Sequence, residues 1–311
     1  MAQTIDYSFV QAFQDQISLL FQEDSQEILS TVRRRNINAK FDHWERLGGV
    51  ELVQVLNRHQ QTPHTPMVHS RRRAVMTDWA GAEYLDQLDQ VKLMIDPRNE
   101  YTQNLLRAWR RRVARTTLAA VIGTATTVDN VDATGSQTLQ ASQQIANGGT
   151  GFTFAKLRQA NRILDNAGVP RDGMRTCVTS AYGIEDLMAD TQFTSSDYNN
   201  LNAIMTGGKV DGLFMGMKWI VISDAVPDDS SIVGASIGVP ASPVLPKAGN
   251  IRSAMLYHQS AVGLSVAKDV DVEIDQRPDL MNTWQVLVKG SFGSVRILDA
   301  GVVQIDFDES V

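Results

Sequence analysis

The chain has 311 residues, of which 43% are hydrophobic and 21% charged, and its formal net charge is -6. This composition excludes a disordered chain and allows one large or two ordinary domains with real cores. Cys177 is the only cysteine and no apolar run is long enough to span a membrane, so disulfides within the chain, cysteine-based zinc sites and an apolar membrane helix are excluded.

The first 50 residues open with an amphipathic pattern and lack the basic start and apolar core of a signal peptide, which favours intracellular synthesis. The run Arg33, Arg34, Arg35 ends the pattern, and two glycines follow at 48 and 49. We expect a helical arm that packs on its own chain or docks on a neighbour. Its apolar residues recur at helical spacing: Phe9, Phe13, Ile17, Ile28, Leu29 and Val32.

Residues 50–95 carry little helical period and many polar residues. Pro63 and Pro66 favour extended backbone there. The stretch 69–79, HSRRRAVMTDW, predicts a strand with a basic half, and 52–58, LVQVLNR, is its expected partner. Compact domains seldom carry so long an excursion without a purpose.

A long helix is predicted from Asp96 to Gly123, with Asp96 as N-cap, Pro97 at the first helical position and Gly123 in the left-handed conformation at the end. We expect its apolar arc to hold the C-terminal strands and the next helix. Arg112 projects into that arc, so burial would require a carboxylate or several carbonyl oxygens as partners. The opposite arc is cationic and carries Arg107, Arg110, Arg111 and Arg115.

The rest of the chain mixes helices and strands, which gives an α+β class. A polar linker over 124–151 predicts a loop or short hairpin, and a helix follows from Phe154 to about Asn166, capped by Thr153 and ended by Gly168 and Pro170. Residues 255–269 are ambiguous between helix and strand. Strands are expected at 174–180, 212–224, 284–288 and 303–307, and helices at 181–190 and 195–208.

Several patterns suggest an enzyme, and each fails on its context. Gly234, Ser236 and Gly238 match the nucleophile elbow G-x-S-x-G, but a proline-rich loop follows instead of a helix, and no acid separates Ser236 from His258. Lys209 lacks the first glycine of a phosphate loop and the Ser or Thr that follows its lysine. We therefore expect no enzyme, no catalytic residue and no cofactor.

Metal and anion sites are weakly indicated. His59, His64 and His69 are five apart, which suits no single face of a regular element. The alternating acids of 269–275 fit a solvated strand face better than a cation site. The glycines at 148, 149 and 151 precede a helix and favour a flexible turn over an anion site. We expect no metal site.

The basic runs leave three alternatives: solvated faces, ion pairs with acidic patches of neighbouring copies, or contacts with nucleic-acid phosphates. The acidic total argues against nucleic-acid binding by the whole surface. The residues concerned are Arg33, Arg34, Arg35, Arg71, Arg72, Arg73, Arg107, Arg110, Arg111 and Arg115.

The order of segments over residues 1–308 resembles the major capsid protein of tailed bacteriophages, the Hong Kong 97-type capsid fold. The resemblance rests on four stretches: 85–123 (LDQLDQVKLMIDPRNEYTQNLLRAWRRRVARTTLAAVIG), 154–190 (FAKLRQANRILDNAGVPRDGMRTCVTSAYGIEDLMAD), 192–223 (QFTSSDYNNLNAIMTGGKVDGLFMGMKWIVIS) and 257–306, which begins YHQSAVGLSVAKDVDVEIDQRPDL. These motifs are diffuse, and order and coverage carry the likeness.

The resemblance implies a division of the chain into segments with known roles. It implies an N-terminal arm (1–49), an extended β loop over an adjacent subunit (50–95), a peripheral domain with the spine helix (96–170), an axial domain (171–270) and return strands of the peripheral domain (271–311).

The resemblance also implies a function and partners. It implies self-assembly, through pentamers and hexamers, into the icosahedral head shell of a tailed phage around non-specifically bound double-stranded DNA. The implied partners are a separate scaffolding protein, a portal and a cement or decoration protein, without a membrane; the implied location is the virion, after assembly in the host cytoplasm. The alternatives are an encapsulin-like compartment of the same fold and a serine hydrolase using Ser236. Residues 50–90 contain no lysine, so lysine cross-links from this loop are not expected.

Overall fold

A computed structural model describes residues 26–54, 58, 61–62, 64–85, 98–128, 134–189, 213–222 and 245–310. Several predicted features lie outside these residues: the helical pattern before residue 26, His59, the N-cap at Asp96 and Pro97, the helix over 195–208, Lys209 and the Ser236 motif.

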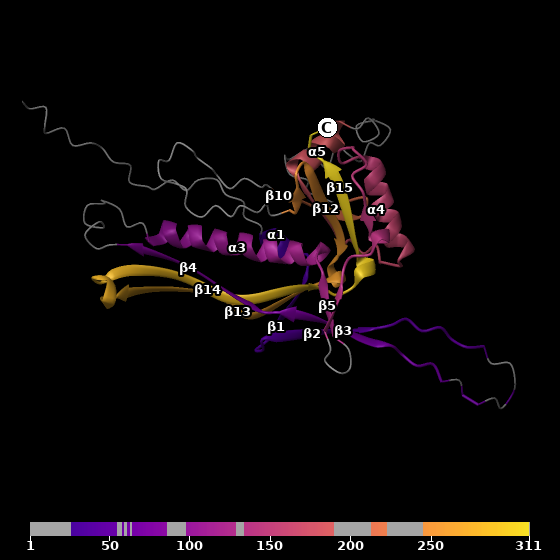
Figure 1. Ribbon diagram of the computed structural model, residues 1–311, viewed down its shortest axis with the longest axis horizontal. Helices are drawn as coiled ribbons and strands as arrows, with labels where there is room; N and C mark the ends of the chain where they lie inside the picture. The colour runs from indigo at the N-terminus through magenta and orange to yellow at the C-terminus, as the bar shows by residue number, and fades with distance from the viewer. Residues whose placement is uncertain are drawn as a thin grey trace, which may run out of the picture.

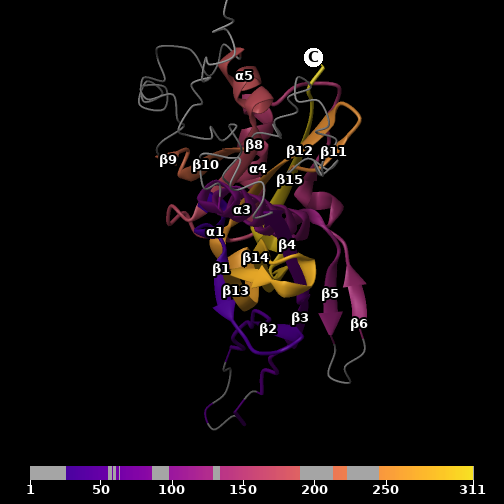
Figure 2. The ribbon, with the colours of Figure 1, turned by 90° about the vertical axis from the view of Figure 1, so that its left-hand side faces the viewer.

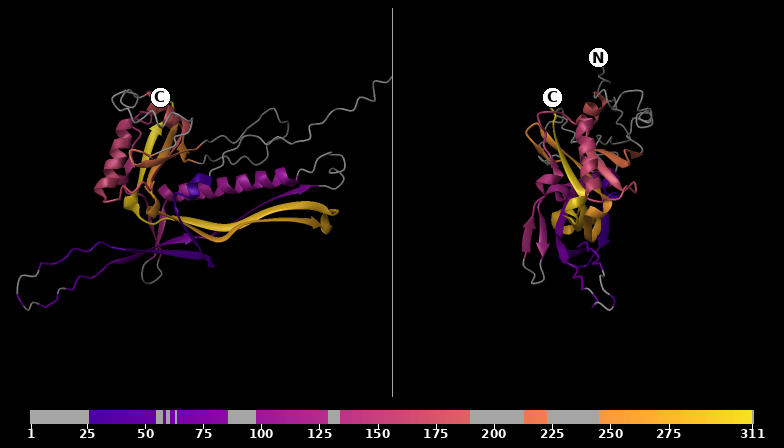
Figure 3. Two further views of the ribbon diagram at one scale, coloured as in Figure 1. Left: turned by 180° about the vertical axis from the view of Figure 1, so that it is seen from behind. Right: turned by 90° about the vertical axis from the view of Figure 1, so that its right-hand side faces the viewer.

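The described chain forms a compact body and a long arm, and a strand-flanked loop projects on the side away from the arm tip (Figures 1 and 3). The helices are α1 (Gln26–Leu29), α3 (Arg98–Ile122), α4 (Phe154–Asn166) and α5 (Ala181–Ala189), with short 3-10 turns η2 (Ala141–Gln143), η4 (Gln259–Ala261), η5 (Pro278–Leu280) and η6 (Asp299–Gly301).

The described strands build three sheets. The arm sheet has the order β1-β13-β14-β4: Arg33–Asn36, Val262–Arg277, Thr283–Arg296 and Thr77–Leu85. The body sheet has the order β7-β15-β12-β8-β10-β9: Gln144–Ile145, Val302–Asp308, Ile251–His258, Arg175–Ser180, Met217–Ile222 and Leu213–Phe214, with β11 (Lys247–Ala248) beside β12. The loop sheet has the order β2-β3-β5-β6: Phe41–Leu47, His69–Val75, Ala125–Val128 and Thr134–Gln137.

The helix α3 lies along the arm sheet and continues to the body (Figure 1). Glycines let it approach closely: a Cβ at Gly290 would meet the ring of Trp109 at 2.5 Å. Trp109 also packs edge-on against Phe292, with ring centroids 5.1 Å apart. The predicted contact of the apolar arc with the C-terminal strands is therefore confirmed.

Two details of this helix differ from expectation. Gly123 is not left-handed: it donates its N–H to the Ala119 carbonyl at 2.9 Å and so continues the helical hydrogen bonding. The second helix, α4, has its buried side chains in a different core cluster from those of α3. The body sheet separates the two clusters, because its strands contribute side chains to both of them.

Local patterns predicted the body well. The helix α4 spans the predicted residues and ends at Gly168, whose φ is +72°. Thr153 occupies the N-cap position, but its side chain makes no capping hydrogen bond. In β15, Val303, Ile305 and Phe307 are buried and alternate with half-buried polar residues, as the period of two predicted. The ambiguous stretch 255–269 is β12, η4 and β13.

Strand pairing between residues far apart in the sequence gives the loop, the arm and the body other limits than the sequence predicted. The partner of β3 is β2 together with β5, not residues 52–58, and β4 pairs with β14 in the arm sheet, so the projecting part is 48–68. The strand β13 starts at Val262 and belongs to the arm, whereas β15 belongs to the body sheet. Alternation within a strand specifies its faces but not its partner, which is why the sequence placed these limits differently.

Two short turns carry the chain between arm and body. β12 passes through η4 into β13, and β14 passes through η6 into β15. The turns touch: Ile297 donates its N–H to the Ala261 carbonyl at 2.7 Å, and a Cβ at Gly301 would meet that of Ala261 at 2.7 Å. The loop sheet lies below this crossing in Figure 2.

Candidate assembly surfaces

The first arginine run forms β1 and is exposed. Arg34 donates from Nη2 to Asp269 Oδ2 at 2.5 Å, and Arg35 is paired with Asp42. The guanidinium of Arg33 lies 5.3 Å from the centre of the Trp44 ring. These contacts hold β1 against its own chain while the side chains remain accessible, and their contacts with a neighbour stay a prediction.

The second run alternates along β3. Arg71 and Arg73 are half-buried, and the Arg73 guanidinium lies 5.0 Å from the Phe41 ring centre. Arg72 points the other way and is only 1% exposed. This burial within its own chain disfavours a contact with a neighbouring copy, and the predicted assembly role of Arg72 stays untested. A pattern of three like residues in one strand hides the fact that successive side chains face opposite ways.

The third run lies on α3, where Arg107, Arg110, Arg111 and Arg115 are all half-buried. Arg110, Arg111 and Arg115 interact with other residues of the molecule. This arc is therefore partly covered, rather than a fully solvated face. Contacts of these four residues with a neighbour stay a prediction.

Arg112, which projects into the apolar arc of α3, has an aromatic partner. Its guanidinium lies over the ring of Trp79 in β4, 3.5 Å from the ring centre, and its Nε is buried without a hydrogen-bond partner in the described chain. The expected carboxylate or carbonyl partners are thus replaced by an aromatic face. Arg112 as a whole is half-buried, and a cation over an indole ring is stabilised electrostatically at such a site.

Four residues at the crossing of arm and body form what we call the junction cluster: Arg46, Arg72, Arg296 and Asp299. The Asp299 carboxylate accepts from Arg296 Nε at 2.7 Å and from Arg72 Nη2 at 2.5 Å, and Arg46 Nη1 lies 3.9 Å from it. Burial lowers the pKa of Arg72, and the attraction of Asp299 opposes that shift.

Arg296 extends the junction cluster to the end of α3. It is fully buried and donates to the carbonyls of Val121, Gly123 and Gln137 at 3.1, 2.5 and 3.0 Å. A guanidinium at the carbonyl end of a helix is favoured by the helix dipole as well as by its hydrogen bonds. The sequence analysis missed this cluster, because its members come from β2, β3, β14 and η6.

The projecting loop carries large apolar side chains in solvent. Leu52 is 97% exposed and Val68 is 70% exposed. Exposed apolar groups gathered on one segment mark an interaction surface more often than single ones do. The exposed apolar residues of the loop and its flanks are Leu47, Val50, Leu52, Val53, Met67 and Val68.

The metal, cation and anion sites considered from the sequence receive no support from the described residues. No group of three or more metal-ligating side chains occurs within the described residues. Asp269, Asp271 and Glu273 are each paired with a cation of the chain. Gly148 and Gly149 form a left-handed turn, and the Lys156 ammonium beside it is held by four carbonyl oxygens, including those of Asn147 and Asp306. Of the described helices, none is long and apolar enough to cross a bilayer.

Comparison with known proteins covers almost the whole chain. A family model described as phage capsid protein matches residues 5–309. No curated protein matches the sequence.

Solved structures are similar over nearly their full lengths. The capsid of cyanophage P-SCSP1u has a TM-score of 0.67 and 13% identity, covering 98% of this chain and 94% of that one. The capsid of Helicobacter pylori bacteriophage KHP30 has a TM-score of 0.65 and 14% sequence identity, and the match covers 99% of this chain and 98% of that one. The structure from Mycobacterium phage Che8 has a TM-score of 0.62 and 14% sequence identity, and the match covers 97% of this chain and 98% of that one. The α+β class and the Hong Kong 97-type capsid fold are thereby confirmed.

Proposed function

The chain belongs to the phage capsid protein family, and on that basis we propose how this major capsid protein builds its shell. It is a structural protein of the virion that associates with its own copies. We propose that the copies form pentamers and hexamers, which close into the icosahedral head of a tailed phage around double-stranded DNA. The body would be the axial domain that surrounds the symmetry axes, and the arm the peripheral domain.

The observation that best supports this proposal is the projecting loop. Its side chains at Leu52 and Val68 are left in water by the chain that carries them. Burying a leucine side chain is worth roughly 1.5–3 kcal/mol, so leaving several exposed is costly unless a partner covers them. We propose that residues 48–68 lie over an adjacent subunit, as the extended loop of the family does. Identical contacts repeated around a closed shell add up to a stable particle.

We propose that the surface arginines contact neighbouring subunits, with the exception of the buried Arg72. Arg33, Arg34, Arg35, Arg71 and Arg73 remain accessible enough to meet a neighbour, whereas Arg72 is removed from the set. The four arginines on the outer arc of α3 remain candidates for contacts with a neighbouring arm or with DNA phosphates. We further propose a separate scaffolding protein, a portal and a cement or decoration protein as partners, with assembly in the host cytoplasm.

Electron microscopy of the purified protein tests the proposal. The chain is produced with and without a scaffolding protein, and negative staining should reveal closed shells or ring-shaped capsomers. A persistent monomer under both conditions would overturn it. The contents of the particles separate the two shell functions, because a phage head takes up DNA through a portal and an encapsulin-like compartment holds cargo protein.

A further inference from the structure

A pocket of 580 Å³ opens on the body, between α4, the segment after it and the turn between β9 and β10. It lies apart from the junction cluster and the projecting loop. Its lining includes Arg158, Arg162 and Arg171, together with Asn161 and a single carboxylate, Asp165. The pocket is therefore cationic in a chain whose overall charge is negative.

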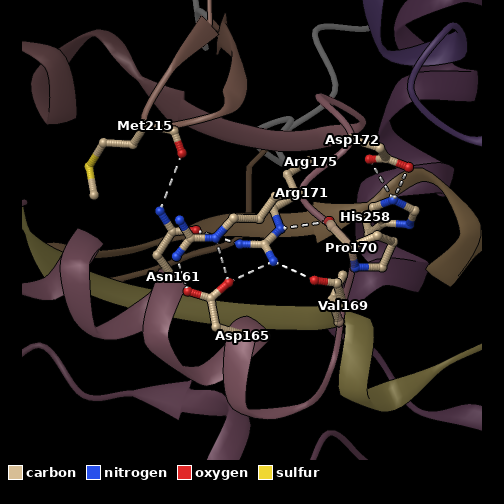
Figure 4. Close-up of polar contacts among 9 residues, drawn as sticks. All are labelled: Asn161, Asp165, Val169, Pro170, Arg171, Asp172, Arg175, Met215 and His258. Atoms are coloured by element: carbon tan, nitrogen blue, oxygen red, sulfur yellow. Dashed lines mark hydrogen bonds and ion pairs between the residues drawn. The ribbon is translucent and has the colours of Figure 1, made fainter.

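The floor of the pocket is held by one buried side chain. Arg175 is 1% exposed and donates to Asn161 Oδ1 at 2.9 Å and to Asp165 Oδ1 at 2.8 Å. It also donates to the carbonyls of Val169 and Pro170 at 2.6 and 3.1 Å (Figure 4). These contacts fix the end of α4 and the turn after it, so the pocket exists before any ligand arrives.

Among the described residues of the lining, Asp165 is the one carboxylate, and it already has partners. Arg171 pairs with both oxygens of Asp165, and Arg175 shares one of them. The Arg171 hydrogen bond holds the pKa of Asp165 well below its usual range; burial opposes this shift and Arg175 adds to it. Asp165 is thus ionised and bound by two guanidinium groups. Its negative charge is therefore already balanced and does not offset the charges of the other arginines in the pocket.

The remaining cations stand side by side on α4. Arg158 and Arg162 are one helical turn apart and exposed, and neither has a carboxylate partner in the described chain. Arg158 has only a distant contact with the Phe154 ring, 5.9 Å from its centre. Like charges at this spacing destabilise a helix. Asn161, which is buried between them, adds an amide whose Nδ2 is 3.5 Å from the Met215 carbonyl. Among the described lining residues, three arginines face one carboxylate, Asp165, which is already paired.

We propose that this pocket binds carboxylates from the N-terminal segment, residues 1–25, of a second copy of the chain. That segment carries Asp6, Asp15, Glu23 and Asp24 and no lysine or arginine. A chain of 25 residues spans up to about 85 Å when extended, so it can reach between neighbours. Two guanidiniums in a preformed pocket match a carboxylate in charge and in paired hydrogen-bond geometry. The inference rests on the proposed shell assembly.

A duplex nucleic acid fits the same pocket less well. Its phosphates lie along a stiff, convex rod and are best met by a long cationic stripe. Here the arginines line a concavity, and the exposed Asp172 carboxylate directly follows Arg171. A flexible acidic segment can enter the concavity, whereas a duplex would touch only its rim. Phosphate binding is therefore the alternative, and it predicts a different outcome in the second experiment.

The first experiment removes the two unpaired charges and compares a matched control. Arg158→Gln with Arg162→Gln should raise the protein concentration needed for assembly about tenfold without lowering the melting temperature of the subunit, because it also removes a like-charge repulsion. The control is Gln140→Glu with Ser142→Glu, two exposed positions outside the pocket lining that change the net charge by the same amount. Equal assembly of the arginine variant and the control would overturn the inference.

The second experiment identifies the bound carboxylate. Particles are assembled from equal amounts of isotope-labelled and unlabelled Arg162→Lys chains, and a carbodiimide then joins the new amine to any carboxylate in contact. Mass spectrometry should find label-mixed peptides that link position 162 to Asp6, Asp15, Glu23 or Asp24. Particles without such links overturn the inference and leave the proposed function intact. If the double glutamine variant assembles normally but loses DNA, the pocket binds phosphate. If the wild-type chain forms no particle at all, the proposed function fails as well.

Discussion

Arg72 and Asp299 lie 227 positions apart in the sequence, and their side chains meet at 2.5 Å between Nη2 and Oδ2. Arg72 sits at the base of the projecting loop, and Asp299 begins the turn that carries the chain from arm to body. The direction of the loop is therefore tied to the crossing of the two parts. Adjustment of the loop to different neighbours should be confined to residues beyond β2 and β3.

Removing the shared carboxylate should destabilise the subunit strongly. Asp299→Ala leaves Arg72 and Arg296 buried without their common anion, and loss of one partner of a buried pair costs about 3–5 kcal/mol. Urea unfolding of the unassembled subunit measures the change. The control is Asp279→Ala, which breaks an exposed pair with Arg277 and should cost less than about 1 kcal/mol. Similar losses for the two variants would contradict the role of the junction cluster.

The three arginines of β3 should separate into two classes. Arg71→Ala with Arg73→Ala should leave the fold intact and impair particle assembly, because both side chains are accessible. Arg72→Ala should lower the free energy of unfolding by about 3 kcal/mol, because Asp299 loses a buried partner. Circular dichroism melting and particle yield are measured on the same preparations. Normal assembly of the double variant would refute the contact role of Arg71 and Arg73.

Polar substitution in the projecting loop should affect assembly alone. Leu52 is almost fully exposed in the subunit, so Leu52→Ser should leave the unfolding free energy within about 0.5 kcal/mol of wild type. If a neighbour covers this side chain, the subunit concentration needed for assembly should rise about tenfold or more. Gln61→Ser, an exposed polar position in the same loop, is the matched control and should assemble normally. An unchanged threshold for Leu52→Ser would argue against the proposed contact.

The ion pairs of Asp165 predict a loss of stability in acid. The pKa of this carboxyl is lowered below its ordinary value of 3.8, chiefly by the Arg171 hydrogen bond. A depressed folded pKa contributes stability that is fully present above 3.8 and is lost as the pH falls further. Asp165→Asn should therefore be less stable than wild type at pH 7, and the difference should shrink below about pH 4. A difference that stays constant across this range would contradict the assignment.

The stacking of Arg112 on Trp79 predicts a specific pattern of rescue. Trp79→Leu removes the aromatic face and should destabilise the subunit by about 1 kcal/mol or more, because the half-buried guanidinium loses its aromatic partner. Trp79→Phe retains a ring and should recover part of the loss. Equal stability of the two variants, measured by urea unfolding, would show that packing volume alone matters at this position.

Local periodicity carried much of the fold. It predicted α3, α4 and α5, each of which buries one stripe, and the alternation in β15. It also predicted β8, whose short apolar run is buried on both faces. The order of segments then led to the correct family resemblance. The strand partners could not be read in this way, because β1 pairs in parallel with β13, more than two hundred residues away.

The sites were harder to predict than the fold. The arginine runs were visible in the sequence, but their division between interior and surface depends on strand alternation and on partners such as Asp299. Arg175 was not singled out from the sequence, although it holds the residues at the floor of the pocket. A charged residue inside an otherwise apolar strand is the one available cue, because such a residue must find partners within the fold.

The touching turns η4 and η6 have a mechanical consequence. The arm, stiffened by the 25 residues of α3, acts as a lever of roughly 37 Å. The strands of the body hold the other side of the pivot, where Gly301 leaves no room for a side chain beside Ala261. In the proposed DNA-filled head, a force on the tip of the arm would reach the body through this crossing. Such a load would be carried by two short turns and the half-buried carboxylate of Asp299.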